Sequence, residues 1–419
     1  MSVVVVGLNH RTVPLPVLER MTVSSSRLPK ALHDLRGRRH LAEAVLLSTC
    51  ARTEIYVVAD KFHGALQSVR DFLAEQFFTA PEEFGDHLYD FYGDAAVQHL
   101  FRVASGVDSA VLGEGEILGQ VGRAAEMARV EGTCGAVLSS LFRHAALVGK
   151  RARSETAIAR GVTSVSHAAV ALAERTHGSL ADCSVLVLGA GESGETMAQA
   201  LKERSGASIR VANRTARKAA EVAQRVGGVP VAVGDLAQHL TEVDVLLSST
   251  SSEEYVLTVE DLQAVQVERA GRPLLIVDVA VPRDVEPAAA NLDGVTLLDM
   301  SDISAFARLG LAARAGEVSS VGAIIEEEVA RYRASTASRE VAPLVVSLHE
   351  RAEALRLAEL ERFRSRLAGL ADKDRAAVEA LTRGIVAKFL HDPTVRLKDN
   401  AGTAQGDRLS DAVRTLFGL

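Results

Sequence analysis

Short aliphatic runs and helical patterns share the first part of the chain. Three runs predict strands, at Ser2–Val6, Ala44–Leu47 and Ile55–Ala59, because they are β-branched or aliphatic and turn signals bound them. Farther on, Ala136–Arg153 carries apolar residues at the spacing of one helical face. Strands mixed with helices predict an α+β domain over residues 1–158.

In the middle of the chain, strands and helices follow one another in turn. After a helix at Ser166–Glu174, the predicted order is strand Val185–Leu188, helix Glu195–Lys202, strand Ser208–Ala212, helix Ala216–Arg225, strand Val243–Ser248 and strand 274–282. Alternation at this spacing predicts a parallel, doubly wound sheet of the Rossmann type over residues 159–303.

Residues 304–419 lack strand patterning and predict a helical domain linked by a long helix. Pro343 is the only proline between Pro287 and Pro393, so long helices are permitted there. A helix with an apolar stripe needs a partner surface, either in a bundle within the chain or in a homodimer, which we favour. The stripe consists of Leu348, Ala352, Leu355, Phe363, Leu367 and Leu370.

Composition and charge narrow the class of protein. The chain has 419 residues, of which 47% are hydrophobic and 24% charged, and this excludes wholesale disorder. A formal charge of -7 excludes a general polyanion binder, so a nucleic acid would need a local basic surface on this protein.

The three cysteines, Cys50, Cys134 and Cys183, are scattered along the chain. This spacing excludes a disulfide framework and a cysteine-based zinc cluster, and we expect no metal. Because the chain shows neither a long apolar stretch nor a secretory signal, we expect a cytoplasmic protein that does not enter a membrane.

A glycine-rich turn follows the first strand of the doubly wound region. In a strand–turn–helix context, the first glycine permits the turn, the second lets the backbone approach a pyrophosphate, and the third allows close packing of helix on strand. The turn therefore predicts a dinucleotide site, the alternative being a Rossmann domain that binds nothing. Its residues are Gly189, Ala190, Gly191, Glu192, Ser193 and Gly194.

The second strand of this region ends in Asn213 and Arg214, where an NAD site usually has Asp or Glu. A guanidinium at this position suits a 2′-phosphate, so we expect the cofactor to be NADPH. The alternative is that Arg214 only caps the turn at the surface.

Cys50 stands in a polar setting directly after an apolar strand. Its neighbours are Ser48, Thr49, Arg52 and Glu54, whereas a structural cysteine usually lies in an apolar stretch. The Arg52 guanidinium could lower the pKa of the thiol, or it could clamp a substrate carboxylate. A thiolate beside a nicotinamide cofactor suggests reduction of an acyl group held as a thioester, which accepts hydride far more readily than a carboxylate does.

His99 lies on a predicted helix, ahead of a polar, glycine-rich segment, Asp108–Gln120. On residue type alone, His99 is either a histidine satisfied at a helix surface or a group that takes part in chemistry. The segment after it either lines a site or simply connects two elements.

Together these segments resemble the glutamyl-tRNA reductase family over nearly the whole chain. Shared dehydrogenase ancestry would explain the glycine-rich turn, but it would not explain STCARTEIY. The matching stretches, in order, are GLNHRTVPLPVLER (7–20), STCARTEIY (48–56), HLFRVASGVDSAVLGEGEILGQV (99–121), GKRARSETAIARGVTSVSHAAVALA (149–173), VLGAGESG (187–194), VANRTARKA (211–219), SSTSS (248–252), DVAVPRDVEP (278–287) and HDPT (391–394).

The resemblance implies NADPH-dependent reduction of glutamyl-tRNA to glutamate-1-semialdehyde with release of the tRNA, the first committed step of tetrapyrrole synthesis. It makes Cys50 the nucleophile that forms a thioester and His99 a residue important for activity. Arg52 would pair with the side-chain carboxylate of the substrate. Glu116 departs from the family, which often has Glu-Pro-Gln here, and it either binds the substrate's ammonium or faces solvent. The residues that would hold the glutamyl group are Thr49, Cys50, Ala51, Arg52, Ser109, Glu114, Gly115, Glu116 and Gln120.

The resemblance also implies a V-shaped homodimer joined through its C-terminal helices and transfer of the aldehyde to the following aminomutase. Because thiolate and hydride donor must meet at one carbon, the nucleotide-binding domain either swings toward the N-terminal domain or lies against it, and for the first case the hypothesis is a hinge near Gly161. Two basic clusters are either tRNA contacts or solvated helix faces: Arg143, Lys150, Arg151, Arg153 and Arg160, and Arg36, Arg38, Arg39 and His40.

Two other functions compete with this one. A shikimate dehydrogenase-type oxidoreductase would share the Rossmann turn, use a catalytic Lys/Asp pair and have no need of Cys50. A redox-sensing regulator would bind NADPH without turnover. The intact STCARTEIY segment counts against both.

Overall fold

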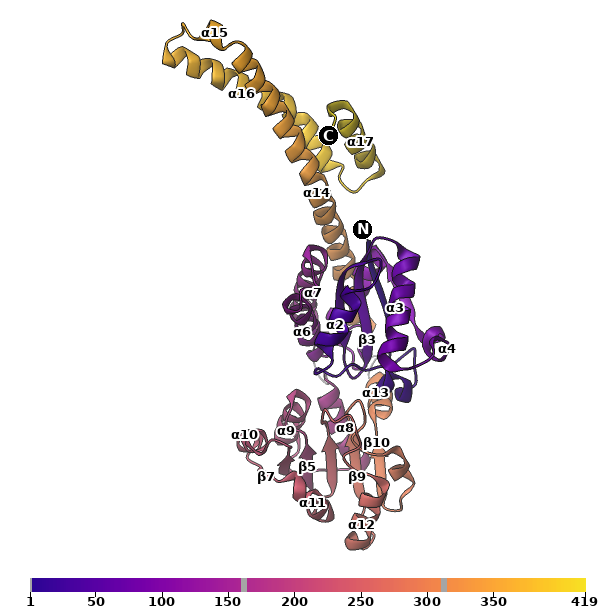
Figure 1. Ribbon diagram of the computed structural model, residues 1–419. Helices are drawn as coiled ribbons and strands as arrows, with labels where there is room; N and C mark the ends of the chain where they lie inside the picture. The colour runs from indigo at the N-terminus through magenta and orange to yellow at the C-terminus, as the bar shows by residue number, and fades with distance from the viewer. Residues whose placement is uncertain (1, 160–163, 310–314) are drawn as a thin grey trace. The chain divides into compact units, whose positions relative to one another are not determined.

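The computed structural model describes residues 2–159, 164–309 and 315–419, which form two compact units, Met1–Glu326 and Glu327–Leu419 (Figure 1). Arg160 of the first basic cluster and the hinge expected near Gly161 lie outside the described residues. The larger unit contains both sheets. The division into three domains at 158 and 303 stays a prediction, and helix α13 (Met300–Leu309) runs across the second of these positions.

The first sheet is antiparallel, with the strand order β2-β3-β1-β4. The three predicted strands are confirmed, each as part of a longer strand. Every residue of β3 is buried, because β3 lies between β2 and β1 and helices cover the sheet. The strands are β1 (Ser2–Asn9), β2 (Leu41–Ser48), β3 (Arg52–Ala59) and β4 (Tyr89–Tyr92).

Helices pack on both sides of this sheet, and Figure 1 shows α6 and α7 on one side and α3 on the other. The helix predicted at Ala136–Arg153 is confirmed as α7, and its predicted apolar face is buried. The helical elements are α1 (Leu15–Arg20), α2 (Leu28–Arg36), α3 (Phe62–Phe77), α4 (Pro81–Phe84), η1 (Gly85–His87), α5 (Asp94–Ala104), α6 (Glu116–Val130) and α7 (Ala136–Glu155).

The second sheet is parallel, with the order β10-β9-β8-β5-β6-β7, which confirms the doubly wound fold. One helix begins earlier than predicted: α9 starts at Glu192 rather than at Glu195, because Gly191 is already its N-cap. The strands are β5 (Ser184–Leu188), β6 (Ser208–Ala212), β7 (Val229–Val231), β8 (Val245–Ser248), β9 (Leu274–Asp278) and β10 (Val295–Leu298).

Both faces of the second sheet are buried, which explains why its strands are continuously apolar. In β5, Val185 and Val187 belong to one apolar cluster, whereas Leu186 and Leu188 belong to the other. The helical elements are α8 (Val165–His177), α9 (Glu192–Arg204), α10 (Ala216–Val226), η2 (Val233–Asp235), α11 (Leu236–Glu242), α12 (Val259–Arg269), η3 (Pro287–Asn291) and α13.

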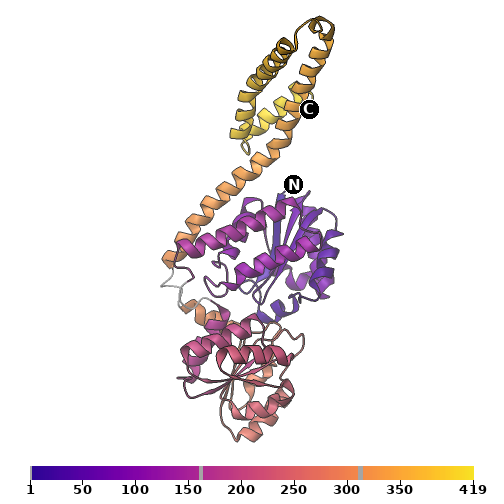
Figure 2. The ribbon, with the colours of Figure 1, turned by 90° about the vertical axis from the view of Figure 1, so that its left-hand side faces the viewer.

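Helix α14 (Ala315–Arg362) leads into the smaller unit, where α16 (Asp372–Asp399) folds back along it through α15 (Arg364–Leu367), as Figures 1 and 2 show. Helix α17 (Ala404–Phe417) completes the unit. Prolines 343 and 393 lie inside α14 and α16, so neither ends its helix.

The predicted apolar stripe of the C-terminal region is only partly buried. Leu348 is fully buried, Leu355 is 56% exposed, and the last three positions of the stripe lie beyond the end of α14. Of the helices in the described part of the chain, none combines the length and the apolar character needed to cross a bilayer.

Candidate active site

Cys50 lies at the tip of a tight hairpin between β2 and β3. The Thr49 N–H donates to the Arg52 carbonyl at 2.8 Å, and the Ala51 N–H donates to the Thr49 hydroxyl at 3.2 Å. The His10 N–H fixes the tip from outside by donating to the Ala51 carbonyl at 2.9 Å. The turn therefore presents a half-buried thiol at the end of a rigid strand pair.

The Cys50 thiol opens into a pocket of about 200 Å³, whose lining includes His10, Leu18, Met300 and Ser304. Burial, followed by the charges of Glu114 and Glu116, raises the pKa of the thiol to about 12. Arg52 lowers it, but Arg52 is the weakest of these influences. Arg52 thus acts on the pKa of the thiol in the expected direction, but burial and the two glutamates outweigh it.

His10 is a site residue that the sequence argument missed. Burial, followed by the charges of Arg52 and Arg11, lowers its pKa to about 4, so the ring is neutral at physiological pH. Among the described residues, its Nδ1 atom is buried and has no hydrogen-bond partner. The only signal in the sequence was its place in the segment 7–20.

Glu54, four residues after Cys50 in the sequence, is the centre of a buried polar network. Its carboxylate accepts hydrogen bonds from the Tyr56 and Tyr89 hydroxyls, both at 2.5 Å, and from the Arg52 guanidinium. Burial by itself raises the pKa of Glu54, but the charge of Arg52 and the hydrogen bonds with His99 and Tyr56 outweigh it and hold the pKa well below its usual range. Glu54 is thus a permanent anion enclosed by the sheet.

His99 belongs to this network rather than to a helix surface. Helix α5 places its Nε2 atom 2.9 Å from a Glu54 oxygen, and its ring stacks on Phe91 with centroids 4.8 Å apart. No hydrogen bond joins His99 to Cys50 in the described part of the chain. The sequence argument named Glu54 only as a polar neighbour of Cys50 and gave no role to Tyr56 or Tyr89, because the groups that contact a buried carboxylate come from elements far apart in the sequence.

Arg52 is 1% exposed, and its guanidinium is already engaged. It pairs with Glu54 and donates both to the Asp108 backbone carbonyl and, at 3.3 Å, to the Asp108 carboxylate. Arg11, half-exposed, pairs with the same carboxylate at 2.8 Å. Arg52 is therefore already paired with two carboxylates, those of Glu54 and Asp108.

The polar segment between α5 and α6 is a loop, and the Arg153 side chain stabilises it through hydrogen bonds to backbone carbonyls. Its guanidinium donates to the Ala104 carbonyl at 3.0 Å and to the Glu114 carbonyl at 2.6 Å. Gly113 requires its glycine, since its φ is +79° and a Cβ would lie 1.9 Å from the Ile158 carbonyl oxygen. Arg153 is therefore part of the loop's support, and its assignment to a basic surface cluster is corrected.

This loop brings acidic site residues close to Cys50. Glu114 is buried beside Ser109, and burial together with the charge of Glu116 raises its pKa to about 7. Glu116 is half-buried, and its pKa is raised by burial and then by Glu192. Of the other residues expected here, Gly115 is the exposed N-cap of α6 and Gln120 is half-buried on α6.

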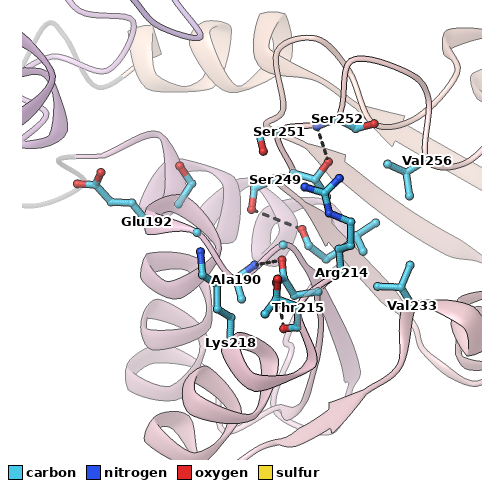
Figure 3. A pocket seen from close by; sticks show the side chains of 16 residues that line it. Ala190, Glu192, Arg214, Thr215, Lys218, Val233, Ser249, Ser251, Ser252 and Val256 are labelled. Atoms are coloured by element: carbon cyan, nitrogen blue, oxygen red, sulfur yellow. Dashed lines mark hydrogen bonds between the residues drawn. The ribbon is translucent and has the colours of Figure 1, made fainter. Parts of the chain in front are cut away.

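The glycine-rich turn forms one wall of a pocket of about 460 Å³ (Figure 3). Gly189 has a φ of +106°, and a Cβ on Gly194 would lie 2.0 Å from the Gly189 carbonyl oxygen. The Ala190 N–H donates to the Asn213 side chain at 3.2 Å, which ties the turn to the end of β6. The first turn of α9 points its free N–H groups at this space, as a pyrophosphate requires.

Two cations line the same pocket on the β6 side. Arg214 and Lys218 are both exposed, and Figure 3 shows Arg214 extending toward the Ser249–Ser252 loop and Lys218 toward Ala190. No carboxylate follows β6 before α10. The turn, the helix terminus and these cations fit a nicotinamide dinucleotide.

The two basic clusters are partly neutralised. Arg38 pairs with Glu75 at 2.5 Å, His40 with Asp60 at 2.8 Å, and Arg151 with Glu155 at 2.8 Å. The exposed members that remain are Arg36, Arg39, Arg143 and Lys150. Among the residues that the structure describes, no three His, Cys, Asp or Glu side chains are grouped as a metal would need.

A half-buried cysteine on one domain and a dinucleotide pocket on a doubly wound sheet define a nicotinamide-dependent oxidoreductase. The family models that match are glutamyl-tRNAGlu reductase, N-terminal domain, over residues 6–156, shikimate / quinate 5-dehydrogenase over 171–306, and glutamyl-tRNAGlu reductase, dimerisation domain, over 320–419. The chain belongs to the glutamyl-tRNA reductase family.

Individual relatives agree over the whole length. The chain is 38% identical over 419 residues to a glutamyl-tRNA reductase of Brevibacillus brevis, covering all of this chain and 92% of that one. It is 39% identical over 420 residues to that of Desulforudis audaxviator, covering 94% of the relative. The solved glutamyl-tRNA reductase of Methanopyrus kandleri is similar, with 34% identity, a TM-score of 0.51, and coverage of 100% of this chain and 99% of that one.

The matches also decide between the alternatives. The dehydrogenase model covers only the nucleotide-binding part, so a shikimate dehydrogenase-type enzyme is not supported for the rest of the chain. The same match supports a nicotinamide cofactor, and the dimerisation-domain match supports a homodimer.

Proposed function

We infer that this chain reduces glutamyl-tRNA to glutamate-1-semialdehyde in tetrapyrrole synthesis. The observation that carries this proposal is the half-buried Cys50 at a hairpin tip, in the same compact unit as a dinucleotide pocket. Relatives named for this activity match over the full length of the chain.

In the reaction, the Cys50 sulfur bonds to the ester carbonyl carbon of glutamyl-tRNA. The ester C–O bond then breaks, and the proton lost by the thiol goes to the 3′-terminal ribose hydroxyl, which leaves with the tRNA. NADPH, when bound, would supply a hydride, and the thioester with this hydride and one proton taken up from solvent becomes a thiohemiacetal. Collapse of the thiohemiacetal restores the thiol and releases the aldehyde.

The substrate itself helps to activate Cys50. In the free protein, Glu114 and Glu116 add to the burial that keeps the thiol protonated. The glutamyl group carries an ammonium, and placing it between these carboxylates cancels their negative charge near the thiol. Binding of the correct substrate therefore lowers the pKa of Cys50, and the thiolate forms when there is an ester to attack.

The buried network holds the remaining site residues. Glu54 fixes the orientation of His99, which transfers a proton or polarises the carbonyl, and it holds Arg52 at the base of the hairpin. Arg52 binds the substrate's side-chain carboxylate when this carboxylate replaces Asp108. Thr49, Ala51, Ser109, Gly115 and Gln120 contact the glutamyl group.

We propose NADPH rather than NADH, because Arg214 and Lys218 can bind a 2′-phosphate at the end of β6. An R214A variant should lower the preference for NADPH over NADH by about tenfold or more. The check is kcat/KM with each cofactor, and an unchanged ratio would contradict the assignment. Handover of the aldehyde to an aminomutase and tRNA contacts through Arg36, Arg39, Arg143 and Lys150 remain predictions.

The direct test uses tRNA charged with labelled glutamate, in the absence of NADPH. After an acid quench, label should be bound covalently to the wild type and not to C50S, and addition of NADPH should release it as an aldehyde. Absence of both label and tRNA-dependent NADPH oxidation would overturn the proposed function.

A further inference from the structure

The segment from Asp278 to Pro287 has no part in the reaction as derived so far, although it contains two of the most buried carboxylates of the chain. Asp278 ends β9 and is 1% exposed, and Asp284 follows a short loop and is 0% exposed. Asp278 accepts hydrogen bonds from the backbone N–H groups of Ala280 at 3.0 Å, Asp284 at 2.8 Å and Val285 at 3.0 Å. These bonds fix the backbone on both sides of Asp284.

Asp284 in turn holds the residues that follow β8. Its carboxylate accepts from the Ser248 hydroxyl at 2.5 Å, from the Thr250 N–H at 2.7 Å and from the Thr250 hydroxyl. All three donors therefore depend on one buried side chain. The Thr250 hydroxyl also accepts from the Ser252 N–H at 3.1 Å, which extends the support along the loop.

The supported loop, Ser249–Ser252, is a wall of the dinucleotide pocket (Figure 3). It also lies directly against the glycine-rich turn, since a Cβ on Gly189 would come within 2.7 Å of the Ser249 carbonyl oxygen. A small displacement of the loop would therefore change the width of the pocket.

The strand order suggests which half of a bound cofactor the loop would face. In a doubly wound fold the turn after β5 would hold the pyrophosphate, and Arg214 after β6 would hold a 2′-phosphate. Strand β8 is on the other side of β5 from β6, so the nicotinamide half would extend toward the loop that follows β8.

We propose that Asp284, itself fixed by Asp278, is a positioning residue that holds the Ser249–Ser252 loop as the nicotinamide-side wall of the cofactor pocket. The inference rests on the proposed function, and it gives this carboxylate pair a role in cofactor binding and hydride transfer but none in formation of the thioester.

Replacement by alanine and by asparagine should have different effects. D284A removes every acceptor and leaves the Ser248 and Thr250 donors buried without a partner. D284N keeps an oxygen for Ser248 and the Thr250 N–H, and its amide can donate to the Thr250 hydroxyl. We therefore expect the NADPH Kd, measured by nicotinamide fluorescence, to rise about tenfold or more in D284A and to stay within about threefold of wild type in D284N.

The kinetic test separates this role from a general loss of structure. In D284A, the KM for NADPH should rise and kcat should fall, whereas acylation of Cys50 by labelled glutamyl-tRNA without NADPH should keep its wild-type rate. T250V, which loses only the hydroxyl, should show a smaller change of the same kind, and it provides the test if D284A does not fold.

A matched control is D244A. Asp244 also accepts a backbone N–H, that of Ser184 at 2.9 Å, but it lies at the other end of β8, away from the pocket. The NADPH Kd of D244A should not change.

Two results would overturn the proposal. One is wild-type NADPH binding in folded D284A and T250V, and the other is an acylation rate that falls in parallel with NADPH binding. Failure of wild-type acylation with normal NADPH binding would overturn the proposed function instead.

Discussion

Two buried carboxylates, Glu54 in the first sheet and Asp278 at the end of β9, are equally enclosed but differ in charge state. Glu54 is surrounded by Arg52, His99 and two tyrosine hydroxyls, and its pKa lies well below the usual range. Asp278 is held by backbone N–H groups and lies beside Asp284, and burial followed by that neighbouring charge raises its pKa to about 7. Burial is common to both, so the nearest charge decides the difference.

The difference in pKa between Glu54 and Asp278 agrees with the role that we propose for each carboxylate. The network around Glu54 surrounds side chains that must keep their orientation and charge while Cys50 reacts. The pair Asp278 and Asp284 supports a loop through hydrogen bonds and needs no cation. The charged network around Glu54 thus supports the residues near Cys50, whereas the hydrogen bonds of Asp278 and Asp284 support the loop that lines the dinucleotide pocket.

The largest effect is expected for E54Q, which removes the anion and leaves the buried Arg52 with Asp108 as its one remaining counter-ion among the described residues. Breaking a buried pair in this way should lower the free energy of unfolding by about 3–5 kcal/mol. Loss of the fixed His99 orientation should lower kcat/KM by about 100-fold or more. Urea unfolding and steady-state kinetics measure the two effects.

The control for E54Q is E75Q, which breaks the pair between the exposed Glu75 and the half-buried Arg38. We expect no measurable change in stability or activity, because exposed ion pairs contribute little. Equal behaviour of the two variants would show that the buried network has no special energetic role.

An intermediate effect is expected in the pH dependence of stability, where the two carboxylates have opposite signs. The pKa of Glu54 is lowered on folding, so its contribution is present above its unfolded pKa of about 4.5 and is lost as the pH falls. The pKa of Asp278 rises from 3.8 to about 7, so its contribution is present below 3.8 and is lost as the pH rises through 7. That loss is at most about 4 kcal/mol.

D284N tests this difference, because it removes the neighbouring charge that raises the pKa of Asp278. Its unfolding free energy should fall less than that of the wild type between about pH 4 and about pH 8. Urea titrations at several pH values provide the measurement. Parallel profiles for the two proteins would mean that Asp278 does not titrate in this range.

Regular elements were predictable from the sequence, because they depend on local patterns. The strand Ser208–Ala212 is found at its predicted bounds, and the dinucleotide turn follows its predicted strand. The start of α9 was missed by three residues, since the turn leads straight into the helix at Gly191. The extent of the C-terminal helix was missed as well, because apolar periodicity continued past its end at Arg362.

The charge state of the site could not be predicted, since it depends on distant partners. Two roles were open for Arg52, an effect on its neighbour Cys50 or a clamp for a substrate carboxylate. In the structure its guanidinium is engaged by Glu54 and by Asp108, which comes from a loop far along the chain. Arg153 looked like a surface cation and is bound to loop carbonyls. Only the fold reveals which charges face each other.

The smallest expected effect concerns Glu114. This residue belongs to the same unit as Glu54, but its pKa resembles that of Asp278, because burial and a neighbouring carboxylate raise it to about 7. E114Q removes a negative charge that raises the pKa of Cys50. Alkylation of Cys50 by iodoacetamide should therefore be faster, by roughly two- to tenfold, at pH values above about 7, where Glu114 carries its charge, and below the pKa of the thiol. C134S and C183S in the background leave Cys50 as the only thiol for the measurement. Slower alkylation in E114Q would mean that Glu114 acts on Cys50 as a base and not as a repelling charge, and the proposed activation by the substrate's ammonium would then fail.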